Sequence, residues 1–230
     1  MPSKSASPLR YLLVVCLAIL GLIGLKLLLT WTAEIYLYSI PIVGGWLKSL
    51  EVAELANIAI FALLGFAIGG ATAYLRPTPL WRSAIPLIIA MPLVFLTSYW
   101  TRYSLWLEQV ASTSNLSRPE TVVLTNESLE AASGSDGFWG FFRFTTQMPV
   151  LPVTLEELNS ITTDQQWFRS ELTRFSGIEP GIFSRMFTAA GWGIRIFHLL
   201  LALLTGVIYF SKGTIWADGA RLRRLAEKKP

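Results

Sequence analysis

Residues 55–75, LANIAIFALLGFAIGGATAYL, form an apolar run without a single charged side chain. Three further runs, at residues 11–32, 83–100 and 189–210, are similarly apolar and carry at most one Lys or Arg each. Each run has roughly 18–22 residues, which as a helix is enough to cross a hydrocarbon core of about 30 Å. Because lipid offers no hydrogen bonds to the backbone, such segments must be helical. We therefore predict four transmembrane helices.

The composition favours a membrane protein over a soluble domain. Hydrophobic residues make up 53% of the 230 residues and charged residues only 15%, whereas globular domains carry about 25% charged residues. The run at residues 11–32 is longer than the apolar core of a signal peptide. A lipoprotein signal would have a small residue before the lipidated cysteine, whereas Cys16 is preceded by Val15. We expect this run to remain as a membrane anchor.

The distribution of charge predicts the orientation. The N-terminal tail 1–10, the turn 76–82 and the C-terminal tail 211–230 together hold ten Lys and Arg residues against two acidic ones. The connection 33–54 and the loop 101–188 hold seven against thirteen acidic ones. Because short basic segments stay in the cytoplasm, we expect both termini inside a bacterial plasma membrane and the loop outside. The net positive charge is then explained by the topology and by attraction of the basic segments to anionic lipid. No nucleic-acid partner is expected.

The outer segments have internal organisation. Residues 33–54 are apolar but contain helix-breaking residues, which suits either an interfacial or a re-entrant segment. Within residues 101–188, the pattern at Thr121–Thr125 predicts a short strand, and Thr154–Glu157 is a capping box that opens a helix, with a second such pattern at Thr163–Gln166. The predicted fold class is an all-α membrane protein with four transmembrane helices and a small extracytoplasmic α(+β) domain between the third and fourth.

The outer loop is unusually rich in aromatic residues. These side chains either form the core of the outer domain or present a surface to a partner or the membrane. The candidate partner surface consists of Phe138, Trp139, Phe141, Phe142, Trp167 and Phe168.

Three polar side chains lie within the predicted spans: Lys26, Arg195 and His198. Buried charge in lipid is costly and often functional. Either both Lys26 and Arg195 extend to the outer headgroups, or one of them pairs with Glu34 or Glu54 inside the helix bundle. A lone histidine supplies neither a multi-histidine metal site nor a bis-histidine haem, so we expect His198 to make a structural hydrogen bond.

Small residues recur at intervals of four in two spans, where they allow helix backbones to approach closely. They either close this bundle or bind helices of another protein. The candidate packing residues are Gly65, Gly69 and Ala73 in the second span, and Ala202 and Gly206 in the fourth.

The sequence contains no pattern for catalysis, and we expect no catalytic residue, cofactor or metal ligand. A single cysteine excludes an internal disulfide, and the motifs of nucleotide binding and zinc proteolysis are missing. Asn115 and Asn126 begin N-glycosylation sequons, which matter only in a secretory-pathway host.

Two functions remain in competition. The first is a non-catalytic component of a membrane complex, such as an accessory subunit, assembly factor or scaffold, acting through its outer domain and small-residue helix faces. Its expected partners are the lipid bilayer and other membrane proteins, or a second copy of itself. The alternative is a small oligomeric transporter, channel or sensor that uses Lys26, Arg195 and His198. Few polar residues in the spans and no evident inverted repeat speak against it.

Overall fold

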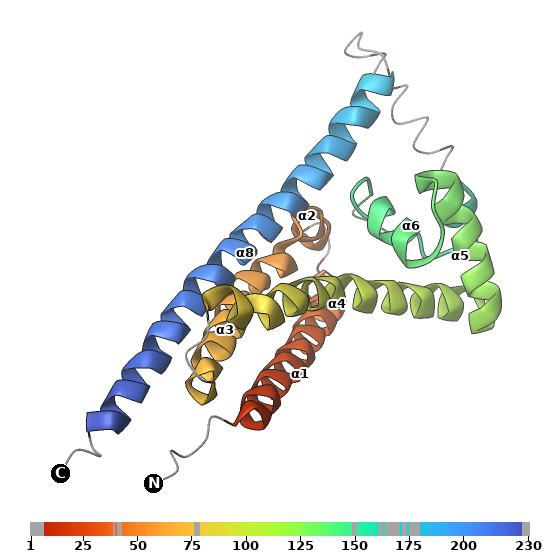
Figure 1. Cartoon of the computed structure of the whole chain (residues 1–230). Helices are drawn as coiled ribbons and strands as arrows, with labels where there is room; N and C mark the ends of the chain where they lie inside the picture. The colour runs from red at the N-terminus through yellow and green to blue at the C-terminus, as the bar shows by residue number, and fades with distance from the viewer. Residues whose placement is uncertain are drawn as a thin grey trace. The chain divides into compact units, whose positions relative to one another are not determined.

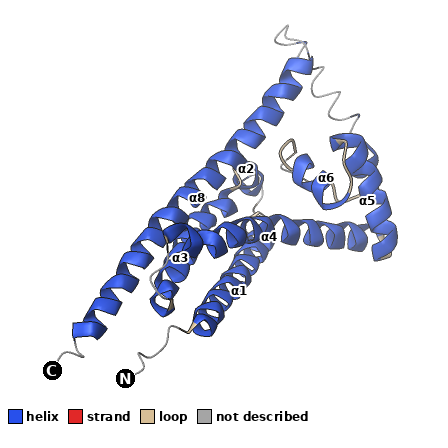
Figure 2. Ribbon diagram, in the orientation of Figure 1, coloured by secondary structure: helices blue, strands red, loops and turns tan. Residues whose placement is uncertain are grey.

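A computed structural model describes most of the chain, and every regular element in the described part is a helix (Figure 2). The described residues are 7–38, 40, 43–75, 79–148, 151–160, 163, 171, 174 and 180–226. The main helices, labelled in Figure 1, are α1 (Pro8–Thr32), α2 (Val43–Ser49), α3 (Ala56–Ala71), α4 (Leu80–Ser114), α5 (Arg118–Ser133), α6 (Gly137–Phe144) and α8 (Pro180–Ala226). Shorter turns of helix lie at Ala33–Leu37 (a π-helix), Val52–Leu55, Thr72–Tyr74 and residues 155–160.

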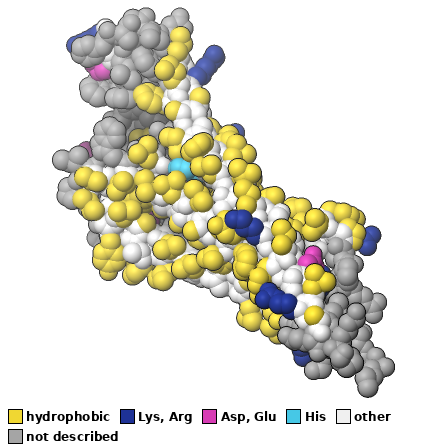
Figure 3. All heavy atoms as spheres, turned by 90° about the vertical axis from the view of Figure 1, so that its left-hand side faces the viewer, with side chains coloured by type: hydrophobic (Ala, Val, Ile, Leu, Met, Phe, Trp, Pro, Cys, Tyr) yellow, Lys and Arg dark blue, Asp and Glu magenta, His cyan; other side chains and the backbone are white. Residues whose placement is uncertain are grey.

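Four helical stretches are long and apolar enough to cross a membrane: Pro8–Leu37, Val52–Tyr74, Leu80–Ser114 and Arg185–Arg223. They confirm the four predicted hydrophobic helices of a multi-pass membrane protein. Their outer surfaces suit lipid, as on α1, where Leu17 is 62% exposed. Figure 3 shows a face of the molecule on which apolar side chains predominate and Lys and Arg side chains are few.

The chain divides into two compact units. Unit 1 comprises Met1–Leu29, Ala53–Ser98 and Phe197–Pro230, and unit 2 comprises Thr30–Val52 and Tyr99–Ile196. The helices α4 and α8 each contribute residues to both.

In unit 1, α3 and α8 meet backbone to backbone at glycines. A Cβ atom built on Gly65 would collide with the carbonyl oxygen of Gly206, and one on Gly69 would collide with that of Phe210. A Cβ atom on Gly213 would lie 2.6 Å from the carbonyl oxygen of Phe66. Because only glycine leaves room for this approach, these residues close the bundle from within.

The remaining predicted packing residues of unit 1 contribute differently. Ala202 on α8 is fully buried. Ala73, in the 3-10 turn after α3, is half-buried. Gly206 also contacts the side chain of Met91 on α4, so the close approach of α3 and α8 is covered on one side by the third hydrophobic helix.

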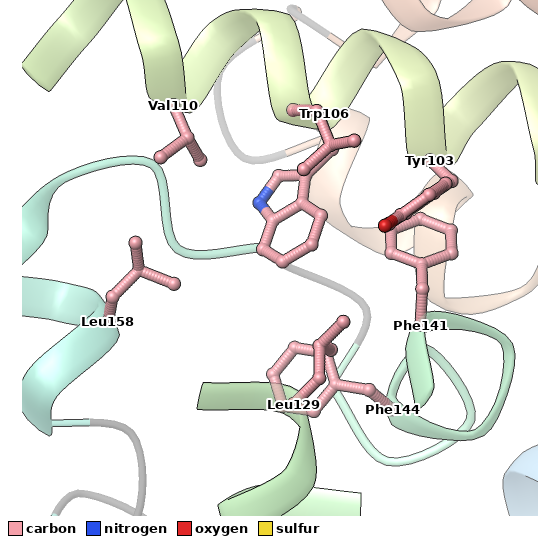
Figure 4. Close-up of a cluster of buried hydrophobic side chains, with 8 residues drawn as sticks. Tyr103, Trp106, Val110, Leu129, Phe141, Phe144 and Leu158 are labelled. Carbon is pink, nitrogen blue, oxygen red and sulfur yellow. The ribbon is translucent and has the colours of Figure 1, made fainter. Parts of the chain in front are cut away.

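Unit 2 has a core of its own, built largely from aromatic residues on α4 and α6 (Figure 4). The indole Nε1 of Trp106 donates a hydrogen bond of 2.7 Å to the carbonyl oxygen of Pro152. This bond satisfies the one polar atom of a large buried side chain. The core consists of Tyr103, Trp106, Leu107, Val110, Leu129, Phe141, Phe144 and Leu158.

The predicted strand at Thr121–Thr125 is wrong, because these residues lie in α5. A capping box between Ser117 and Glu120 starts the helix, and helix formation then continues through the threonines. The hydroxyl of Thr121 donates to the carbonyl oxygen of Ser117 at 3.0 Å, and that of Thr125 donates to the carbonyl oxygen of Thr121 at 2.7 Å. With their hydroxyls satisfied inside the helix, these buried residues need no strand partner, and every regular element among the described residues of 101–188 is a helix.

The capping box predicted at Thr154–Glu157 is present. Glu157 Oε2 accepts hydrogen bonds from the backbone N–H groups of Val153 at 2.8 Å and Thr154 at 3.2 Å, and the hydroxyl oxygen of Thr154 accepts one from the N–H of Glu157. The box predicted at Thr163–Gln166, apart from Thr163 itself, lies outside the described residues.

Candidate functional site

Glu34 lies at the centre of a buried ionic cluster in unit 2. It belongs to the π-helix that follows α1, and such insertions often mark functional positions. Its Oε2 accepts a hydrogen bond from Lys48 Nζ on α2 at 2.9 Å, and its Oε1 lies 2.7 Å from Arg102 Nε on α4. The side chains of Glu34, Lys48 and Arg102 are 8%, 16% and 4% exposed. We call these three residues the Glu34 cluster.

Glu51 forms a second ionic pair in the same unit. It has a left-handed backbone conformation, with φ of 49°, a strained state for a residue other than glycine. Its Oε1 lies 2.5 Å from Arg195 Nη2, and its Oε2 accepts a hydrogen bond from the hydroxyl of Tyr99 at 3.0 Å. The carboxylate therefore joins the turn after α2 to α4 and α8.

The guanidinium of Arg195 is enclosed by aromatic rings and oxygen acceptors. Its Cζ lies 4.4 Å from the ring centroids of both Tyr99 and Phe142, and 5.7 Å from that of Trp192. Nη1 donates to the carbonyl oxygen of Phe142 at 2.5 Å, and Nη2 donates to Thr145 Oγ1 at 3.2 Å. Such contacts with a desolvated cation stabilise it by about 2 kcal/mol, so Arg195 holds α6 and α8 together.

Unit 1 contains a separate buried cluster at the start of α3. Lys26 Nζ on α1 donates to Glu54 Oε2 at 3.2 Å, and Asn57 Nδ2 donates to the same oxygen at 2.6 Å. All three side chains are at most 1% exposed. Glu54 Oε1 and Asn57 Oδ1 have no hydrogen-bond partner among the described residues. We call these residues the Lys26 cluster.

The predicted intramembrane residues lie in different surroundings. Lys26 and Arg195 are paired and buried rather than extended towards headgroups. Glu54, which pairs with Lys26, is one of the two partners predicted from the sequence. Glu51, which pairs with Arg195, is not. His198 is 7% exposed, its Nδ1 has no hydrogen-bond partner among the described residues, and its ring lies 6.0 Å from that of Phe197. The expected structural hydrogen bond is therefore not formed at Nδ1.

Sequence reasoning missed the residues that complete these clusters. Glu51 precedes the uncharged run by four residues, and Arg102 follows the third run by two residues. Charged residues at such boundaries are ordinarily solvated, so the sequence alone does not mark these two as buried. The signal that could have singled them out is the gathering of both acids and cations in residues 33–54 and at the adjoining ends of the spans.

The predicted partner surface is divided by α6. Phe141 on one face of this helix is fully buried in the core, whereas Trp139 on another is 59% exposed. Phe138 lies beside Trp139 at 5.2 Å between ring centroids and beside Trp100 of α4 at 5.5 Å, and Trp100 is 57% exposed. We call Trp100, Phe138 and Trp139 the aromatic surface.

The other members of the predicted surface are accounted for separately. Phe142 is half-buried and contacts Arg195 through its ring and its carbonyl oxygen. Trp167 and Phe168 lie outside the described residues.

The chemistry of the described side chains is that of ion pairing and packing. Among the described residues no group of three or more His, Cys, Asp or Glu side chains lies close enough to hold a metal ion. Cys16 is exposed and forms no disulfide. Comparison of the chain with protein-family models, curated proteins and solved structures finds no match.

Proposed function

We propose that this chain is a non-catalytic component of a membrane protein complex: an accessory subunit, assembly factor or scaffold. Four hydrophobic helices anchor it, and its aromatic surface binds the partner. The observation that carries the proposal is the exposure of Trp100 and Trp139, each of which is more than half exposed. Neither residue belongs to the buried core of unit 2.

The aromatic surface has the properties of a binding hot spot. Tryptophan and other aromatic residues dominate the energetics of protein interfaces, because each buries a large area with little loss of conformational freedom. Phe138 packs between Trp100 and Trp139, so both rings have a fixed neighbour. A Cβ atom on Gly140 would collide with the carbonyl oxygen of Ser135, which indicates that α6 is seated closely on the preceding loop.

The glycines of α3 and α8 are assigned a different role. Gly65, Gly69 and Gly206 are in contact with backbone or side-chain atoms of unit 1, and these contacts use the small-residue faces that a foreign helix would need. This supports a partner contact through the aromatic surface rather than through these faces. Lys26 and Arg195 are likewise held in ion pairs, which favours a structural role over a transport path.

The proposed setting is a bacterial plasma membrane with both termini in the cytoplasm and residues 101–188 outside. The basic tails and the acidic outer segments support it. Reporter fusions after residues 130 and 225 test it, since a cytoplasmic signal at 130 would reverse the orientation.

The function is tested by purification in mild detergent with quantification of co-purifying proteins. We expect a stoichiometric partner, either another membrane protein or a second copy of the chain. The amount of co-purifying partner should be unchanged for Val123→Ser. It should fall about tenfold or more for the double variant Trp100→Ser/Trp139→Ser, because each hot-spot side chain contributes about 2 kcal/mol to binding. Val123 is the matched control, since it is 59% exposed in the same unit but outside the aromatic surface.

Two results would argue against this function. One is an identical set of partners for all three proteins, which would separate partner binding from the aromatic surface. The other is a lone homo-oligomer whose ion flux in liposomes depends on Lys26 or Arg195, which would favour the transporter.

A further inference from the structure

The buried charges that the structure describes in unit 2 do not balance. Glu51 is neutralised by Arg195 at 2.5 Å. Glu34 faces two cations, with Lys48 on one carboxylate oxygen and Arg102 on the other. Among these five residues, three cations therefore meet two carboxylates, which leaves one positive charge in excess. Buried charge of one sign is costly unless a counter-charge is near.

Arg102 has hydrogen-bond donors to spare. A guanidinium carries five N–H donors, and the side chain of Arg102 is only 4% exposed. Its Nε lies 2.7 Å from Glu34 Oε1. The angles at this contact do not make a hydrogen bond, so both buried atoms are without one. No described residue accepts a hydrogen bond from the guanidinium. Only Nε among these donors is buried without a hydrogen bond, so the two Nη groups remain available to an acceptor beyond the described residues.

Lys48 supplies a second, more accessible cation beside the first. Its Nζ uses one of three N–H donors on Glu34, and it lies 5.6 Å from the ring centroid of Tyr38. Burial lowers the pKa of the Lys48 ammonium, and the charge of Arg102 adds to this effect, while the carboxylate of Glu34 opposes it. An additional anion beside Lys48 would act in the same direction as Glu34 and favour the charged ammonium.

We propose that Lys48 and Arg102 form a binding site for a phosphate group. A phosphate offers several acceptor oxygens to one ligand, which matches the planar fork of an arginine and the point charge of a lysine. Glu34 holds the two cations apart, one on each oxygen, and leaves their other donors to the ligand. The phosphate comes either from a phospholipid headgroup or from free solution.

The position of the cluster along the chain supports a headgroup source. Glu34 lies near the end of the first hydrophobic stretch, Pro8–Leu37, and Lys48 lies between that stretch and the next, Val52–Tyr74. The ends of membrane spans are where headgroup phosphates are found, and basic residues there attract anionic lipid.

The test uses the full chain, purified in a phosphate-free maltoside detergent and stripped of lipid. One readout is the rate at which an amine-reactive reagent modifies Lys48, measured by peptide mass spectrometry with added inorganic phosphate, with phosphatidylglycerol, or with chloride at equal ionic strength. The other readout is the number of phosphatidylglycerol molecules retained in native mass spectrometry. We expect phosphate or phosphatidylglycerol to slow the modification at least threefold relative to chloride.

The two ligands distinguish the source. Protection by inorganic phosphate alone identifies free phosphate, and protection only by phosphatidylglycerol, with one lipid retained per chain, identifies a headgroup. If neither ligand protects Lys48 and no lipid is retained, the site does not exist.

Variants place the ligand on the two cations. Lys48→Gln and Arg102→Gln should each weaken binding about tenfold, the effect of one charge-assisted hydrogen bond, whereas Arg143→Gln, an exposed arginine of unit 2, should bind as the wild type does. Glu34→Gln should bind at least threefold more tightly, because it removes the competing carboxylate. Lys48 is the more exposed cation, so its variant remains informative if Arg102→Gln fails to fold by circular dichroism. Equal binding by Lys48→Gln and the wild type would overturn the proposal.

Discussion

Lys26 Nζ lies 3.2 Å from Glu54 Oε2, and both side chains are 1% exposed. This ion pair joins α1 to the turn that begins α3, and Asn57 donates a second hydrogen bond to the same oxygen. Each of the two buried charges has the other as its counter-charge. The stability of unit 1 should therefore depend on both residues together rather than on either charge alone.

The variant Lys26→Met should destabilise the protein by about 3–5 kcal/mol, because it leaves the carboxylate of Glu54 buried without its cation. The double variant Lys26→Met/Glu54→Met should recover most of this loss, since two apolar side chains can replace a buried pair at little cost. Unfolding in detergent, followed by circular dichroism, measures both. A double variant as unstable as the single one would contradict this account of the pair.

The variant Gly65→Ala should destabilise the contact of α3 with α8 by about 1–3 kcal/mol, the usual effect of overpacking. The added methyl group would meet the backbone of Gly206, which cannot move aside as a side chain can. Gly21→Ala on α1 is the matched control, because a Cβ atom there meets nothing within 4 Å. It should be neutral or stabilising by up to about 1 kcal/mol, and equal effects of the two substitutions would argue against the close approach.

The variant Phe141→Ala should cost about 3–5 kcal/mol, because it opens a cavity in the core of unit 2. Trp139→Ala, two residues earlier on α6, should change stability by less than about 0.5 kcal/mol, because its side chain is 59% exposed. Thermal unfolding in detergent compares the two. Similar losses for both variants would mean that the exposed tryptophan is part of the core.

The capping box at Glu157 should make stability depend on pH. Hydrogen bonds from the backbone N–H groups of Val153 and Thr154 hold the pKa of Glu157 below its usual range. A lowered folded-state pKa gives stability that is present above the carboxyl group's ordinary pKa and is lost as pH falls through the folded value. The difference in Tm between the wild type and Glu157→Gln should therefore be largest near neutral pH and shrink in acid. A difference that stays constant with pH would exclude this carboxylate as the cause.

The sequence was most informative where the solvent decides the structure. Residues 55–75 had to be helical because lipid satisfies no backbone group, and the same argument located the other three hydrophobic helices. It was least informative where two preferences compete. Thr121–Thr125 combine β-branched residues with a capping box just before them, and the cap prevailed.

The ionic clusters could not be predicted in full, because their partners are distant in sequence. Glu51 and Arg195 are 144 positions apart, and no local pattern joins them. Glu34 and Glu54 were the two predicted partners of Lys26 or Arg195; Glu54 does pair with Lys26, whereas Glu34 pairs with Lys48 and Arg102 instead. Arg102 appeared to be an ordinary outer charge until its neighbours were known, since burial depends on packing that the sequence does not display.

The backbone contact between α3 and α8 also bears on how the chain can diverge. Lipid-facing leucines can be exchanged for many other apolar residues, so most of the hydrophobic sequence is free to drift. Gly65, Gly69 and Gly213 have no such freedom while this contact persists, since a Cβ atom at any of them would meet the opposite backbone. Two glycines four apart in the second span and one glycine in the fourth should therefore outlast the rest of the pattern. A distant relative of this protein is best recognised by these glycines rather than by overall similarity.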